Sequence, residues 1–171
     1  EVSGPSPLRE WREIAALADA IVALHRRWPF DLLHAHSPAL NGLAALRAAQ
    51  RLGVPLVYEI RAFWEDAAVG NGTGSEGSAK YRLTRALENY VVNHADAVAV
   101  ICEGLKSDLV GRGVPPSKIT ISPNGVDLEL FGSPSPLDAE LAAQLGLTGK
   151  DVIGYIGSFY DYEGLDDLIA A

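Results

Sequence analysis

The sequence predicts an α/β protein built on a doubly wound parallel sheet. Four short, nearly continuous apolar runs have the length and composition of buried strands. Segments with apolar residues at helical spacing separate these runs. Such an alternation builds a parallel sheet with helices on both faces. The chain has 171 residues, of which 48% are hydrophobic, which is enough for one sizeable core and too little for two complete α/β domains.

The expected elements follow one another in regular order. The strands are rich in residues that favour extended structure, and we expect them at residues 32–35, 56–60, 97–101 and 119–121. The helices have an apolar residue at every third or fourth position, and we expect them at residues 7–28, 40–52, 78–94 and 103–111. Pro29 ends the first helix, and Gly53 can form a left-handed cap after the second.

A second α/β unit is expected after a segment rich in glycine, serine and proline, whose composition marks a linker between domains. It continues with a helix at residues 137–145, a strand at 152–156 and a glycine turn that leads into a new helix. The chain therefore divides into a partial first domain, a linker and the beginning of a second domain, at residues 1–123, 124–136 and 137–171. Because the chain lacks methionine and stops inside a helical pattern, we expect sequence to be missing at both ends.

Composition excludes several classes of partner. A net charge of −8 leaves no basic excess for a phosphate backbone, so no nucleic acid is expected. The lone Cys102 cannot form an internal disulfide, and no apolar run approaches the roughly 18 residues that span a bilayer. We therefore expect a soluble, cytoplasmic protein.

Candidate site residues lie where the strands end, because ligands of open parallel sheets bind outside the carboxyl ends of the strands. His36 follows the first strand, Glu59 lies near the end of the second, and Arg61 follows the second. His34 and His36 share one face of their strand, as two metal ligands could, but no carboxylate or cysteine stands at a recognised spacing. No metal site is therefore expected.

A long segment with many glycines, residues 62–77, follows Arg61 and is either a functional lid or slack. It begins with Phe63, Trp64, Glu65 and Asp66. A guanidinium beside aromatic rings and acids suits recognition of a sugar or a phosphate. The alternative is a loop anchored by salt bridges.

Four motifs in order resemble family 4 of the retaining glycosyltransferases with two Rossmann-like domains, the GT-B fold. They are Asp31–Ser37 (D-x-x-H-x-H), Ala95–Val100 (A-D-x-V), Ile121–Phe131 (P-N-G-V-D-x-x-x-F) and Gly154–Ala171, the glycine turn on the donor side. Residues 58–66 and 157–160 are also similar to a bacterial subgroup of exopolysaccharide and exosortase systems.

The resemblance implies transfer of a sugar from a nucleotide-sugar to a glycan or a lipid-linked saccharide, with retention and without metal or cofactor, in polysaccharide biosynthesis. The first domain would bind the acceptor and the second the donor, in the cytoplasm or at the inner face of the membrane with peripheral contact. By resemblance and position, the site residues are catalytic Arg61, Glu59 and His36; donor-binding Gly157, Ser158, Glu163 and Gly164; and acceptor-side or lid residues Trp64, Glu65, Asp66 and Asn124.

Two departures from the family pattern leave alternatives open. Ser158 and Glu163 stand where many members carry arginine and lysine, and Arg61 stands where they carry histidine. Arg61 or residues further along the chain would have to supply the missing cations. The alternative is a noncatalytic α/β domain that binds a sugar or a nucleotide. A dinucleotide-dependent oxidoreductase is disfavoured, since no strand leads into a G-x-G-x-x-G helix. With its second domain incomplete, the chain alone is expected to be inactive.

Overall fold

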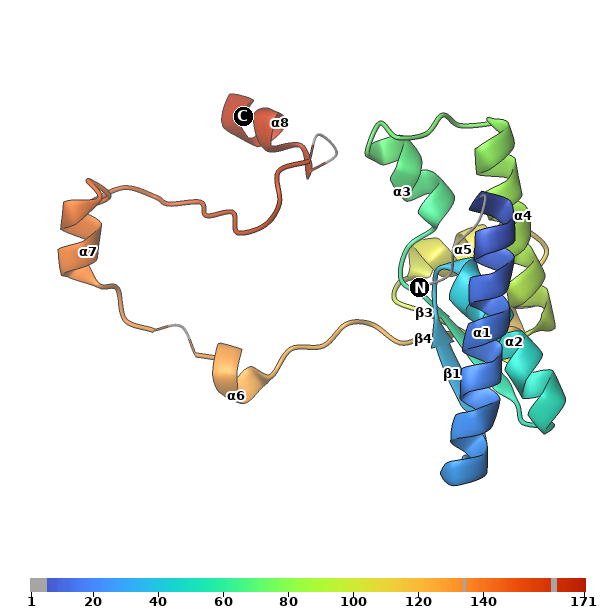
Figure 1. The fold of residues 1–171 in the computed structure, drawn as a ribbon. Helices are drawn as coiled ribbons and strands as arrows, with labels where there is room; N and C mark the ends of the chain where they lie inside the picture. The colour runs from blue at the N-terminus through green and yellow to red at the C-terminus, as the bar shows by residue number, and fades with distance from the viewer. Residues whose placement is uncertain (1–5, 134, 161–162) are drawn as a thin grey trace. The chain divides into compact units, whose positions relative to one another are not determined.

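The computed structural model describes residues 6–133, 135–160 and 163–171 (Figure 1). Contacts divide the chain into two compact units, Glu1–Pro123 and Asn124–Ala171. The first unit contains the sheet and the hydrophobic core. Within the described residues, no helix is both long and apolar enough to cross a bilayer.

Four parallel strands lie at the centre of the first unit in the order of the sequence. They are β1 (Leu33–His36), β2 (Leu56–Ile60), β3 (Ala97–Val100) and β4 (Ile119–Ile121). All four were predicted to within a residue of their observed bounds, because each is a compact apolar run between turn residues. The α/β class and the parallel sheet are confirmed.

The connecting helices also lie where apolar periodicity predicts them. They are α1 (Ser6–Arg27), α2 (Ala39–Leu52), α4 (Ala79–His94) and α5 (Glu103–Gly111). Gly53 takes the left-handed conformation after α2, with a φ of 69°, as predicted. Ser78 caps α4 by accepting a hydrogen bond from the Tyr81 N–H. Figure 1 shows α2 and α4 together beside the strands.

The helices that connect the strands cover one face of the sheet. On that face, Leu56, Tyr58 and Val100 are fully buried. On the other face, Val57 and Ala99 are only half-buried and His36 is exposed. Strands in consecutive order with right-handed connections place every connecting helix on the same side. The helix layer expected on the second face is therefore not found among the residues that the structure describes.

The core contains one buried polar pair. Tyr58, at the centre of the sheet, donates its hydroxyl proton to Glu88 Oε1 on α4 at 2.7 Å. Both side chains are fully buried. A Cβ atom at Gly42 of α2 would lie 2.7 Å from the Tyr58 ring and 2.6 Å from a Val91 methyl, so only glycine lets α2 pack this closely. Burial raises the pKa of Glu88 to about 6, although the hydrogen bond from Tyr58 opposes the shift.

One helix of the first unit was not predicted. This helix, α3 (Trp64–Gly70), lies inside the long glycine-rich segment. On α1 the buried residues are Ile14, Ala18 and Val22, whereas Trp11 is 57% exposed. Helix α1 packs along α2 at the edge of the sheet, and the narrow contact covers one residue per turn.

Within the part of the second unit that the structure describes, three short α-helices form: α6 (Leu128–Phe131), α7 (Ala139–Gln144) and α8 (Leu165–Ala170). The strand predicted at residues 152–156 does not form. Ile153 and Ile156 are instead 77% and 103% exposed. A parallel strand needs a neighbour to accept its hydrogen bonds, and no strand is found among the described residues of this unit. That prediction was wrong because an apolar run alone does not supply the partner.

We predict that Glu88→Gln removes much of the pH dependence of stability. The folded pKa of Glu88 is about 6 against the usual 4.5, so the folded state holds this proton more tightly. The resulting stabilisation, roughly 2 kcal/mol, is complete below pH 4.5 and is lost as pH rises through 6. Urea unfolding across this range measures it. Glu76→Gln, in an exposed loop, is the control. An unchanged slope in Glu88→Gln would contradict the assignment.

Candidate functional site

Three predicted site residues and one neighbour meet on the open face of the sheet, near the carboxyl ends of β1 and β2. Register places His36 directly beside Glu59. Arg61 Nε donates to Glu59 Oε1 at 3.0 Å, and His36 Nδ1 lies 3.5 Å from the same oxygen. His34 Nε2 lies 2.9 Å from Glu59 Oε2. Glu59 is therefore the centre of a cluster of basic groups, which we call the Glu59 cluster: His34, His36, Glu59 and Arg61.

The cluster keeps its carboxylate charged. Partial burial of Glu59 raises its pKa. The hydrogen bond from Arg61 and the charges of His36, Arg61 and His34 lower the pKa by more than burial raises it, so the net shift is downward. The side chain of Arg61 is 61% exposed. Its guanidinium group is thus oriented by Glu59 while most of its surface remains available to a ligand.

The α3 helix is fixed to the body of the unit by a buried ion pair. Arg112, just after α5, donates through Nη1 to Glu65 Oε1 at 2.8 Å, and both side chains are at most 3% exposed. Arg112 also pairs with Asp108 and lies over the Phe63 ring, 3.9 Å from its centroid. The other Glu65 oxygen, Oε2, is buried and has no hydrogen-bond partner among the described residues.

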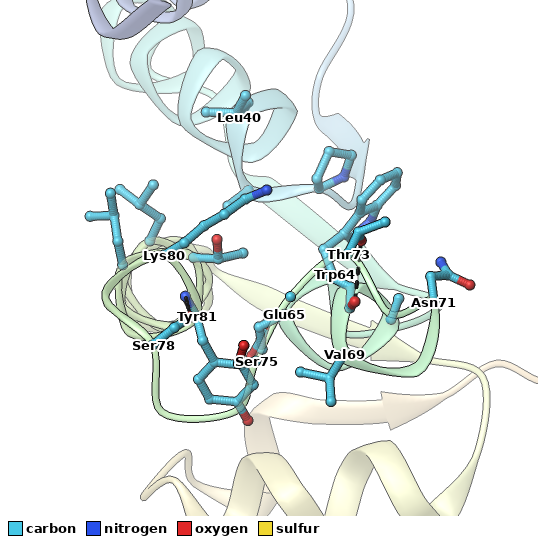
Figure 2. A pocket seen from close by; sticks show the side chains of 18 of the residues that line it. Leu40, Trp64, Glu65, Val69, Asn71, Thr73, Ser75, Ser78, Lys80 and Tyr81 are labelled. Atoms are coloured by element: carbon cyan, nitrogen blue, oxygen red, sulfur yellow. Dashed lines mark hydrogen bonds between the residues drawn. The ribbon is translucent and has the colours of Figure 1, made fainter. Parts of the chain in front are cut away.

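A pocket of about 560 Å³ lies between α3, the loop that follows it and the first turns of α4. Its wall is largely apolar, and Pro38 and Ala39 of the β1–α2 junction also line it. Trp64, 52% exposed, and Glu65 line it from α3, and Lys80 reaches across it from α4 (Figure 2). The segment predicted to be a lid or slack is therefore a helix and loop that form a pocket wall.

The loop is tied back to α4 by one of the predicted residues. Asp66 accepts a hydrogen bond from the Tyr81 hydroxyl at 2.8 Å. The Thr73 N–H also donates to the Ala68 carbonyl, which closes the turn after α3. Asp66 therefore shapes the loop, whereas Trp64 offers its ring to the pocket.

The remaining predicted residues belong to the second unit. Asn124 is exposed at its beginning. The Ser158 carbonyl accepts from the Tyr155 hydroxyl at 2.8 Å, and Gly164, with a φ of 65°, precedes α8. Gly157 and Glu163 are in irregular or single-turn structure. The helix α8 has only six residues, so its amino end does not by itself make an anion site.

Sequence reasoning missed His34 as a partner of Glu59 and Arg112 as a partner of Glu65. The sequence relates His34 only to His36 on its own strand, because no spacing along the chain connects His34 with Glu59. Arg112 lies 47 residues from Glu65, in a glycine-flanked turn that gives no sign of burial. Lys80 was not predicted either, since nothing in its local sequence places it beside residues 64–75.

Comparison with known proteins shows a match to one family model. Residues 2–125 match the model of the glycosyl transferase 4-like domain. The chain is 31% identical over 152 residues to a D-inositol 3-phosphate glycosyltransferase of Kineococcus radiotolerans, which is 87% of this chain and 34% of that protein. It is 28% identical over 138 residues to a GDP-mannose-dependent alpha-mannosyltransferase of Mycobacterium tuberculosis, 81% of this chain and 35% of that protein.

A third similar protein is named for a different activity. The chain is 25% identical over 150 residues to an alpha-maltose-1-phosphate synthase of Mycolicibacterium smegmatis, 82% of this chain and 36% of that protein. The chain thus spans about a third of the length of the curated relatives that it matches.

We predict that Arg112→Met destabilises the first unit by about 3 kcal/mol, because it leaves the Glu65 carboxylate buried without a positive partner. The double variant Arg112→Met/Glu65→Leu should lose less than the single variant, since it removes both charges. Urea unfolding followed by circular dichroism measures both. A loss below about 1 kcal/mol in the single variant would show that the pair is not buried as described.

Proposed function

We propose that the first unit of this chain, which belongs to the glycosyl transferase 4-like family, is the acceptor side of a retaining glycosyltransferase. The relatives are glycosyltransferases, which supports the general class of reaction. The proposed reaction moves a sugar from a nucleotide-sugar to a glycan or a lipid-linked saccharide with retention of configuration. The proposed place is the cytoplasm, at the inner face of the membrane.

The observation that carries the proposal is an oriented guanidinium beside a pocket at the carboxyl edge of the sheet. Arg61 is held by Glu59 at 3.0 Å and remains mostly exposed. The pocket-lining residues Pro38 and Trp64 follow His36 and Arg61 closely in sequence, so the cluster and the pocket share one edge. This is where a parallel sheet binds its ligand.

In the proposed chemistry, Arg61 stabilises the negative charge that develops on the departing diphosphate. In glycosyl transfer the transition state resembles an oxocarbenium ion, and the departing diphosphate needs fixed dipoles or cations. Ser158 and Glu163 supply no cation at the donor turn. Arg61 would supply one from the acceptor side, Glu59 would orient it, and His36, half exposed, would hydrogen-bond the acceptor. The transfer itself would need no cofactor.

The pocket has the groups to bind a hydroxylated acceptor. The Trp64 ring is exposed and can stack on the apolar face of a sugar or a cyclic polyol. Lys80 adds a positive charge that suits a phosphorylated acceptor. The name of the Kineococcus relative, D-inositol 3-phosphate glycosyltransferase, supports a polyol phosphate as a first probe.

The second unit would begin the donor side, with residues 124–136 as an interdomain linker and Asn124 at its start. Gly157, Ser158, Glu163 and Gly164 would lie at the donor diphosphate. Because the strand at residues 152–156 does not form here, we propose that this chain alone does not transfer sugar. The noncatalytic alternative, a sugar- or nucleotide-binding domain, is favoured by one observation, the absence of cations at positions 158 and 163.

We predict that Arg61→Ala, in a protein that joins this chain to a complete second domain, lowers the transfer rate at least tenfold, about 1.4 kcal/mol of transition-state stabilisation. Release of nucleoside diphosphate from a panel of nucleotide-sugars, with inositol phosphates and mannosides as acceptors, measures the rate. Proton NMR of the product reports its anomeric configuration.

Arg51→Ala is the matched control, because Arg51 is also an exposed arginine paired with a carboxylate, that of Asp19. It should leave the rate within about twofold of the original. An unchanged transfer rate in Arg61→Ala would show that Arg61 only anchors the loop through its salt bridge and takes no part in transfer. No release with any donor and acceptor would favour the noncatalytic binding domain.

A further inference from the structure

Two histidines and one carboxylate converge on the open face of the sheet. His34 and His36 are two residues apart on β1 and project to the same side, with ring centroids 4.8 Å apart. Glu59 lies on the neighbouring strand, directly beside His36 in register. The strand ends are fixed together, since the Ser37 N–H donates to the Glu59 carbonyl at 2.8 Å. The three side chains therefore project from a rigid support.

Two of the three distances between the ligand atoms match those around one metal ion. His34 Nε2 lies 2.9 Å from Glu59 Oε2, and His36 Nδ1 lies 3.5 Å from Glu59 Oε1. One ligand atom from each residue lies within 4.8 Å of the others. Around a tetrahedral zinc ion with bonds of about 2.0–2.1 Å, ligand atoms are ~3.3 Å apart, so both measured distances are close to what zinc requires. The rings, 45% and 52% exposed, can turn to close the third distance.

We propose that His34, His36 and Glu59 bind Zn²⁺, with water completing the coordination. Two imidazoles and one carboxylate are a ligand set that zinc uses in proteins when it keeps a water ligand. The hard cations Mg²⁺ and Ca²⁺ prefer oxygen ligands and gain little from imidazole. The site differs from an ordinary surface ion pair because two neighbouring imidazoles face one carboxylate.

Arg61 is the competitor for this site. Its Nε donates to Glu59 Oε1, the oxygen that also faces His36. A bound ion repels the guanidinium group, which is exposed and can turn into solvent. If the proposed function holds, zinc would therefore act as an inhibitor that separates Arg61 from Glu59, and not as a cofactor.

Isothermal titration of the 171-residue chain with zinc chloride tests the site, with magnesium chloride as the negative probe. We expect one zinc ion per chain and no heat with magnesium. His34→Ala, His36→Ala and Glu59→Gln should each weaken zinc binding at least tenfold. His94→Ala is the matched control, because His94 is an exposed histidine on α4 whose Nδ1 lies 2.8 Å from the Tyr90 carbonyl oxygen. It should bind zinc as the original chain does.

Arg61→Ala should tighten zinc binding, because it removes the competing cation. Circular dichroism of each variant separates loss of the site from loss of the fold, and His36→Ala changes only an exposed ring. Absence of saturable zinc binding up to about 1 mM would overturn the proposal. Full retention of binding in the double variant His34→Ala/His36→Ala would also overturn it. Neither result depends on sugar transfer, so failure here leaves the proposed function to its own test.

Discussion

The rest of the candidate site depends on the hydrogen-bonded register between β1 and β2. This register puts Tyr58 beside Ala35 under the helices and Glu59 beside His36 on the open face. A shift of one residue would turn Glu59 into the core and expose the Tyr58 ring. The Tyr58–Glu88 hydrogen bond and the close packing at Gly42 oppose such a shift from the buried side. The core thus determines which groups the carboxylate of Glu59 can meet.

A second constraint positions the pocket. The buried Glu65–Arg112 pair attaches α3, in the glycine-rich segment after β2, to the turn after α5. Asp66 and Tyr81 close the other side of the loop. A pair that is costly to bury stabilises little by itself, but it specifies one position for α3. The exposed Trp64 ring and the pocket floor take their places from that position.

The elements that the sequence predicted are those that local pattern determines. The run at residues 56–60 and the cap at Gly53 need no knowledge of the rest of the chain. The contacts of Glu59 with His34 and of Glu65 with Arg112 depend on register and on packing across many residues, which periodicity does not reveal. The strand at residues 152–156 was predicted wrongly for the same reason, since the described residues of the second unit offer its apolar run no strand to pair with.

An acceptor that binds the first unit as proposed would lie beside Trp64. The chain has three tryptophans, and among the described residues only Trp64 lines the pocket beside α3. Nitrogen-15 NMR of the three indole N–H groups, during titration with inositol phosphates and mannosides, tests this most directly. We expect the Trp64 signal to shift and that of Trp28, exposed just after α1, to stay unchanged. Binding that moves only the Trp28 signal, or no binding by any probe, would contradict it.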